Sequence, residues 1–143
     1  MQVFIIGSPL ETAMILDKKR LNKQIVECGQ ILSALNGESK SWLNHPCTLQ
    51  YKNHKQWLHN YKLCLYYYKC GDYEFAKKLS NICDINRPQF HTNEYFNQMK
   101  RRLYTKDNKH YYQFNSFGES NVNWYYVNNS WKYYENGKQI KKD

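Results

Sequence analysis

The stretch LDKKRLNKQIVECGQIL, residues 16–32, decides the fold class of this 143-residue chain. Its apolar residues recur at steps of three and four, which is typical of an amphipathic helix with one buried face. The periodic positions are Leu21, Ile25, Cys28, Ile31, Leu32 and Leu35. A second stripe, polar and carrying both signs of charge, has the same spacing and consists of Asp17, Arg20, Gln24 and Glu27. An apolar core does not require that second stripe.

The residues before this stretch predict a second, shorter helix. In SPLE, residues 8–11, Ser8 is a suitable N-cap, Pro9 suits the first helical position, and Glu11 completes a capping box. The helix then either continues past Leu16 or ends there, with Asp17 capping the next one. Asn36-Gly37 predicts the end of the long helix.

The middle of the chain continues the helical pattern. A loop at residues 41–47, broken by Pro46, precedes a helix at 55–69, and a capped helix follows from Asp72 through Ile82. After a linker at 86–90, Thr92 starts a helix that directs Lys100, Arg101 and Arg102 outward.

The pattern changes near the carboxyl end. WYYVNNSWKYYENGKQI, residues 124–140, predicts aromatic strands with turns at Asn128-Asn129 and Asn136-Gly137. We therefore expect a mainly α protein, a single compact domain of about four to five helices over residues 1–111. Residues 112–143 form a basic, aromatic tail, either a short β-hairpin or an extended arm.

Composition narrows the class of partner. Lys and Arg together number 21, against 12 Asp and Glu, and this excess of positive charge favours binding to phosphates. The chain also has 14 Tyr and 4 Trp, whose rings can stack on nucleic-acid bases. The alternative is that the rings are core and the lysines aid solubility. The sequence predicts no membrane span, signal peptide or cysteine-based zinc site, which favours an intracellular protein with buried thiols.

Three motifs carry a family resemblance. They are the spacing of residues 17–27, the run Asn44-His45-Pro46, and Lys106-Asp107 with His110-Tyr111. With these motifs the chain resembles the pyrimidine-dimer DNA glycosylases of the phage endonuclease V group, and most closely their small bacterial and viral relatives. The tail segment WKYYENGK, residues 131–138, is similar to the basic aromatic segment that those enzymes lay against DNA.

The resemblance implies a DNA-repair glycosylase with AP-lyase activity that acts on damaged or modified pyrimidines in duplex DNA by base flipping. The nucleophile is then the terminal α-amine, which titrates near about 7.7–8.0 in peptides and attacks C1′ as lysine does in Schiff-base chemistry. Because Met is normally retained before a bulky Gln2, Met1 supplies the amine. We expect a monomer that uses no cofactor or metal.

The resemblance also assigns residue roles. Glu27 is the first candidate for the proton-transferring carboxylate and Asp17 the second, beside the Met1 nucleophile. The expected nucleic-acid contacts are Arg20, Lys23, Gln24, Asn44, His45, Lys100, Arg101, Lys106, His110, Trp131, Lys132 and Tyr133.

Two alternatives stay open. The stripe can be a structural ion-pair network, because Arg20 is three residues from Asp17 and Lys23 is four from Glu27. The protein can also be an inactive relative that binds nucleic acid or a phosphorylated nucleotide, for example in a virus–host conflict. Gln2, and the absence of a Glu directly beside an Arg in the helix, favour that second interpretation.

Overall fold

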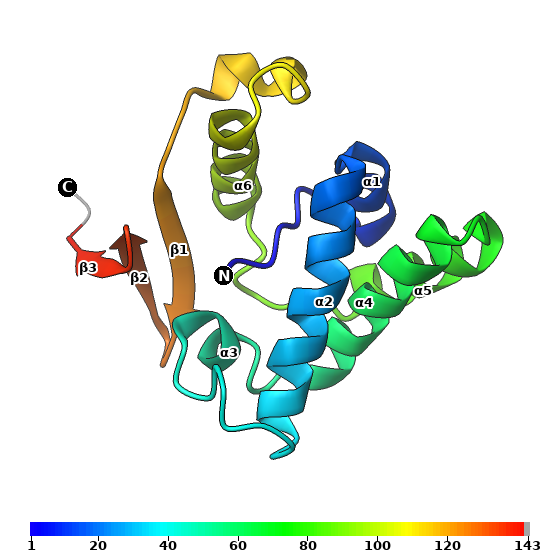
Figure 1. Ribbon diagram of the computed structural model, residues 1–143, viewed down its shortest axis with the longest axis horizontal. Helices are drawn as coiled ribbons and strands as arrows, with labels where there is room; N and C mark the ends of the chain where they lie inside the picture. Colours follow the sequence, from blue (N-terminus) through cyan, green and yellow to red (C-terminus); the bar gives the residue numbers. More distant parts are fainter. Residues whose placement is uncertain (142–143) are drawn as a thin grey trace. The chain divides into compact units, whose positions relative to one another are not determined.

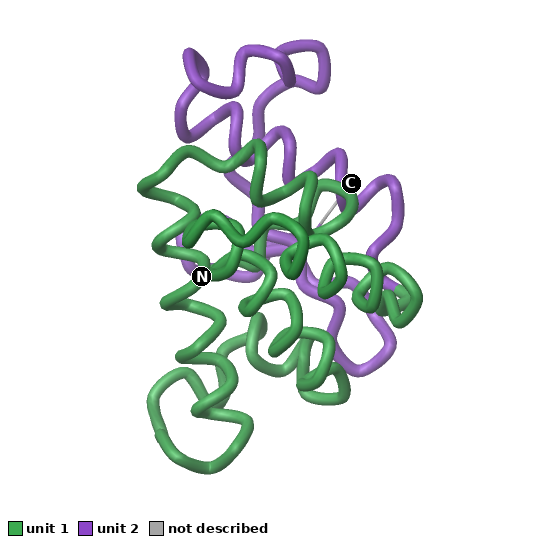
Figure 2. The backbone as a smooth tube through the Cα atoms, turned by 90° about the vertical axis from the view of Figure 1, so that its right-hand side faces the viewer, with its two compact units in different colours: residues 1–89 green, residues 90–143 purple. Residues whose placement is uncertain are grey.

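The computed structural model describes residues 1–141. The chain divides into two compact units, Met1–Gln89 and Phe90–Asp143 (Figure 2). The division falls inside the predicted linker at 86–90. It assigns the helix after that linker to the second unit, whereas the sequence grouped residues 1–111 together, and that grouping stays a prediction. The expected mainly α class with a small carboxyl-terminal β element is confirmed.

The first unit is helical. Its helices are α1 (Pro9–Ile15), α2 (Lys18–Leu35), α3 (Pro46–Gln50), α4 (Lys55–Lys69) and α5 (Tyr73–Ile85). Helix α4 packs against α2 and α5, while α1 contacts α4 and α5, and α3 contacts α2 (Figure 1). The long helix predicted from residues 16–32 is α2, which packs against α4 and α3.

The helix ends follow local signals. The Ser8 side chain accepts a hydrogen bond from the Glu11 backbone and Glu11 bonds back, which completes the capping box and starts α1 at Pro9. Asp17 is the N-cap of a separate helix, so the alternative of one continuous helix is excluded. Gly37 has a φ of 75°, a left-handed conformation that glycine adopts without strain and that ends α2.

The expectation that Pro46 breaks a loop is wrong. Pro46 is the first residue of the five-residue helix α3, where its missing N–H is not needed and its fixed φ suits a helix. The preceding His45 is the N-cap, and its Nδ1 accepts a hydrogen bond from the Cys47 backbone at 3.0 Å. Pro46 thus opens a helix that positions His45.

The second unit combines one long helix with a sheet. Its elements are α6 (Asn93–Lys106), the 3-10 helix η1 (Tyr112–Phe117), β1 (Val122–Val127), β2 (Ser130–Glu135) and β3 (Lys138–Ile140). The strands form an antiparallel sheet in the order β1-β2-β3, with both predicted turns in place. Asn128 and Asn129 have φ values of 53° and 62°, as a two-residue hairpin turn requires. Helix η1 was not foreseen.

The prediction that three basic side chains of α6 point outward is wrong for two of them. Arg101 donates from Nε to the Phe117 carbonyl at 2.8 Å, and Arg102 donates from Nε to the Asn123 side chain at 2.9 Å. Both residues are half-buried. Their guanidinium groups hold the segment after η1 and strand β1 against α6, which helix periodicity alone does not reveal.

The prediction of buried thiols is confirmed for four of the five cysteines. Cys28, Cys47, Cys64 and Cys83 are buried free thiols as expected, and Cys70 is exposed. Within residues 1–141, no helix combines the length and the apolar character needed to cross a membrane.

Candidate active site

The amino-terminal segment lies fixed inside the first unit. Residues 1–7 precede α1, and residues 2–6 are buried. The Gln24 side chain, only 2 % exposed, accepts a hydrogen bond from the Phe4 backbone at 2.9 Å and donates one to the Gln2 carbonyl at 2.8 Å. The Gln24 amide thus bonds to one backbone N–H and one backbone carbonyl of this segment, as the backbone of a neighbouring β-strand would.

Other groups hold the same segment. The Tyr61 hydroxyl of α4 donates to the Phe4 carbonyl, and the Thr12 hydroxyl accepts from the Ile6 backbone at 3.1 Å. The Val3 backbone bonds to the Cys47 thiol at the start of α3. Helices α1 to α4 therefore all fix the segment, and its position determines where the α-amino group of Met1 lies.

The α-amino group lies near the start of α3. Burial lowers the pKa of the His45 imidazole, and the positive charge of the α-amino group lowers it further. The same amine acts on Cys47, because its charge lowers the pKa of that thiol while burial raises it. The half-buried Met1 thus brings its amine close enough to both side chains for a direct electrostatic effect.

Glu27 belongs to the same cluster. Its carboxylate raises the pKa of the Cys47 thiol, on which the amine acts with the opposite sign. It also raises the pKa of the Cys28 thiol, after the larger effects of burial and of Cys47. Cys47 therefore lies within electrostatic range of both the α-amine and Glu27.

The thiols of the cluster are not nucleophiles at neutral pH. Burial is the main cause that raises the pKa of Cys47 to about 12 and that of Cys28 well above its ordinary value. Because the thiolate is the reactive form, both side chains act as small apolar groups. The role of the α-amine as the nucleophile stays a prediction.

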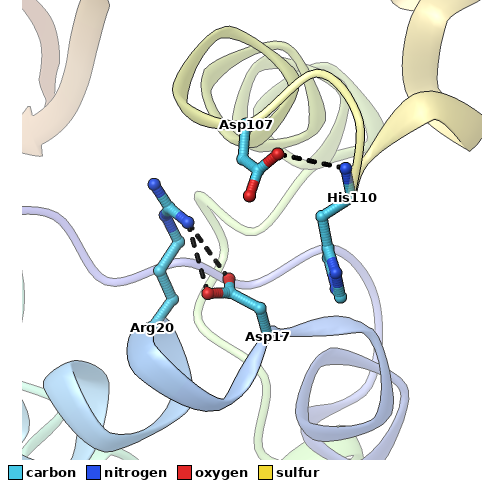
Figure 3. A network of polar contacts seen from close by, with 4 residues as sticks. All are labelled: Asp17, Arg20, Asp107 and His110. Atoms are coloured by element: carbon cyan, nitrogen blue, oxygen red, sulfur yellow. Dashed lines mark hydrogen bonds and ion pairs between the residues drawn. The ribbon is translucent and has the colours of Figure 1, made fainter.

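The polar stripe of α2 contains both ion pairs that the structural alternative required. Arg20 Nη1 lies 3.2 Å and 3.3 Å from the two carboxylate oxygens of Asp17 (Figure 3). Lys23 Nζ lies 3.9 Å from the Glu27 carboxylate. The second pair is asymmetric, because the Glu27 side chain is 12 % exposed and the Lys23 side chain 66 %. An ion pair with a solvated lysine is weak.

A polar groove, missed by the sequence analysis, lies between the second half of α2 and α4. It has a volume of about 480 Å³. Its lining includes Lys55, His59 and Lys62 from α4, together with Ser33 and Glu38. Lys62 also lowers the pKa of Cys28, which joins one end of this groove to the cluster around Cys47. Three basic side chains at helical spacing can hold phosphate oxygens, and that spacing is the signal that sequence could have supplied.

The predicted basic residues of α6 and the following loop lie in the second unit. Lys100 Nζ stands 4.7 Å from the centre of the Phe117 ring, and Lys106 is exposed at the end of the helix. The exposed His110 donates its backbone N–H to the Asp107 carboxylate at 3.1 Å (Figure 3). Its ring contacts Tyr111 edge to face at 4.7 Å.

The predicted aromatic contacts of the tail lie on β2. Trp131 packs against Tyr95 of α6 at 5.6 Å and against Tyr126 of β1 at 5.2 Å. The Tyr133 ring contacts the Trp124 ring, with centres 5.5 Å apart. Lys132, between Trp131 and Tyr133 in the sequence, is half-buried. These rings pack within the second unit, which agrees with the alternative that the aromatic residues belong to the core. Their contact with nucleic acid stays a prediction. Asn44 is exposed in the first unit, beside His45.

The described part of the chain, residues 1–141, contains no group of three or more His, Cys, Asp or Glu side chains placed to hold a metal ion. The cluster around Cys47 is organised by hydrogen bonds and charge.

Comparison with known proteins gives a family match over the first part of the chain. The family model described as pyrimidine dimer DNA glycosylase matches residues 1–68, which comprise the amino-terminal segment, α1 to α3 and nearly all of α4. The resemblance expected from the sequence is confirmed over that range. No curated protein and no solved structure gives a significant match.

Proposed function

We propose that the protein is a DNA glycosylase with AP-lyase activity that acts on damaged or modified pyrimidines in duplex DNA. The Met1 α-amine is the nucleophile and Glu27 the proton-transferring carboxylate. The observation that carries the proposal is the clamped amino-terminal segment, because Gln24, three residues before Glu27 on α2, holds the backbone of residues 2 and 4 and so fixes the Met1 amine beside that helix. The match of residues 1–68 to the pyrimidine dimer DNA glycosylase family supports it.

The proposed reaction begins with the neutral amine. Its nitrogen attacks C1′ of the nucleotide, the bond from C1′ to the base breaks, and the base leaves with the bonding electrons and takes up a proton. The nitrogen gives up two protons, one to the departing base and one to O4′, as the C1′–O4′ bond breaks and the opened sugar becomes an imine. Removal of a proton from C2′ then expels the 3′ phosphate and cuts the strand. Glu27 carries the protons in these steps, which is the role of a general acid and base.

Each unit carries proposed DNA contacts of its own. In the first unit, Arg20, Lys23, Asn44 and His45 contact phosphates near the extruded nucleotide. In the second unit, the proposed contacts are Lys100, Lys106, His110, Trp131, Lys132 and Tyr133, whereas Arg101 is used by the Phe117 carbonyl. Gln24 takes a different role from the one expected, because its amide is used by the backbone of residues 2 and 4. It is a positioning residue for the amine.

Borohydride trapping tests the proposal directly. Sodium borohydride reduces an imine between protein and DNA to a stable adduct, which gel electrophoresis resolves and peptide mapping locates. The substrates are duplexes with a pyrimidine dimer, an abasic site or a modified pyrimidine, and an undamaged duplex is the control. We expect an adduct at Met1 with at least one damaged duplex.

A blocked amino terminus is the matched control. A short peptide added before Met1 removes the amine from the site and should abolish the adduct, whereas the same peptide added after Asp143 should not. An adduct that persists on the extended protein assigns the nucleophile to a lysine and overturns the role of Met1. Binding of duplex DNA without any adduct across the panel supports the inactive relative instead, an interpretation that Gln2 and the absence of a Glu directly beside an Arg in the helix favour.

A further inference from the structure

The loop between α2 and α3 exposes two large apolar side chains. Trp42 and Leu43 are 43 % and 44 % exposed. Trp42 has a φ of 66°, and its carbonyl accepts a hydrogen bond from the His45 backbone at 3.1 Å, which closes the turn. A bulky residue in the left-handed region is an outlier, because its Cβ crowds the backbone there. Such strain, kept beside an exposed ring, points to a function.

The turn places the Trp42 ring beside the candidate active site. The indole contacts the His45 imidazole edge to face, with ring centres 5.5 Å apart and planes at 71°. His45 is fixed from its other side, since its Nδ1 accepts the Cys47 backbone N–H. The α-amine acts electrostatically on the same imidazole. His45 therefore contacts the exposed ring and also lies within electrostatic range of the amine.

We propose that Trp42 is the base-stacking residue of this site. Its exposed ring stacks on a base that has lost its neighbour in the strand, next to the nucleotide that the amine attacks. Aromatic side chains stabilise unstacked bases whatever their sequence, and extrusion of a nucleotide creates such a base. The exposed Lys40, two residues earlier in the loop, supplies positive charge for the adjoining phosphate. The location of the attacked nucleotide rests on the proposed function, whereas the stacking does not.

Substitution of Trp42 separates stacking from a structural role. Trp42→Gly removes the ring and places at this φ the one residue that adopts it freely, so the melting temperature should stay the same or rise. Affinity for single-stranded DNA and for a duplex with an abasic gap should fall about 5- to 100-fold, because one stacked base is lost. Trp42→Phe keeps a ring and should retain most of the affinity. Leu43→Ala, at the neighbouring exposed residue, should change it little.

Tryptophan fluorescence gives a second readout. Of the four tryptophans, Trp42 is the one classed as exposed, while Trp57 and Trp124 are buried and Trp131 is half-buried. Stacking on a base should quench the Trp42 emission when single-stranded or gapped DNA is added, and the quench should be much smaller in Trp42→Phe, although that variant still binds and keeps Trp131. An intact duplex should quench much less.

Three results overturn the inference. The first is a Trp42→Gly protein that melts at a lower temperature but binds unstacked DNA as tightly as the wild type. The second is an equal loss of affinity of that variant for gapped and intact duplexes, and the third is no quench of the Trp42 emission by any nucleic acid. These measurements do not use catalysis. If borohydride trapping fails while the quench is seen, the proposed function is wrong and the stacking role stands. If borohydride trapping succeeds and no quench is seen, the proposed function stands and the stacking role of Trp42 is wrong.

Discussion

At the scale of single residues, Glu27 is a largely buried carboxylate on α2, whereas the Lys23 ammonium 3.9 Å away remains mostly exposed. Surface pairs of this kind contribute about 0–1 kcal/mol, so this pair adds little to stability. Under the proposed function, Glu27 carries protons beside the Met1 amine.

Glu27→Gln should keep the fold and DNA affinity and abolish base release. Gln retains the shape but cannot carry a proton, so the rate should fall about 10²- to 10⁴-fold. Single-turnover cleavage of the substrate found by trapping measures the rate, and thermal melting and DNA binding check the rest. Asp17→Asn is the matched control and should remain active. An inactive Asp17 variant beside an active Glu27 variant reverses the two assignments.

His45 predicts a pH dependence of stability. Burial, and then the charged amine, hold the folded-state pKa of His45 below the value of 6.5 for the free side chain. The unfolded chain therefore binds more protons as the pH drops. The stability contributed by neutral His45 is fully present above pH 6.5 and is lost as the pH falls through the lowered folded-state pKa.

His45→Asn removes this titration and keeps a side-chain acceptor for the Cys47 N–H. The melting temperature of the wild type should decrease more steeply below pH 6.5 than that of the variant. Burial also lowers the pKa of His54, but that contribution is present in both proteins and cancels in the difference. Parallel curves would show that His45 titrates alike in the folded and unfolded states.

At the scale of elements, the clamp between α2 and the amino-terminal segment links the fold to the site. A segment without a regular partner strand leaves backbone groups unpaired, and Gln24 satisfies two of them in a buried position. The same amide fixes the register of residues 2 and 4, and through them the direction of the terminal amine.

Gln24→Ala should therefore weaken stability and chemistry together. Two buried backbone groups lose their partners, which costs about 2–4 kcal/mol of unfolding free energy by urea titration. Borohydride trapping should fall in the folded fraction, because the amine is no longer held in place. Gln30→Ala changes an exposed residue of the same type on the same helix and should affect neither. Full trapping by the Gln24 variant would show that other contacts suffice to place the amine.

At the scale of the whole molecule, a formal net charge of +9 predicts a strong dependence of DNA binding on salt. Each phosphate contacted releases counterions, so log K should fall against log salt with a slope of about −0.9 per contact. Lys62→Ala, in the groove beside the cluster, should reduce that slope by about one contact. Lys78→Ala, at an exposed lysine of α5, should leave it unchanged. An affinity independent of salt would contradict a phosphate-binding role for the basic residues.

The sequence by itself determined the helices other than α3 and η1, the turns of the sheet, and the family resemblance over residues 1–68. The Ser8 capping box, the Asp72 cap and the Asn-containing turns need only hydrogen bonds between residues a few positions apart, so each signal is complete within a short segment. The sequence also supplied Met1, Glu27 and His45 as candidates, because their motif spacing is fixed along the chain.

Only the tertiary structure decided what these residues touch. Gln24 bonds to backbone 20 and 22 residues away, and Tyr61 reaches Phe4 across 57 residues, so no local pattern could reveal that the polar stripe holds the amino terminus. The inward Arg102 and the left-handed Trp42 were equally hidden. The physical reason is that partners distant in sequence are chosen by packing and by the need to satisfy buried polar groups, and both are properties of the folded chain.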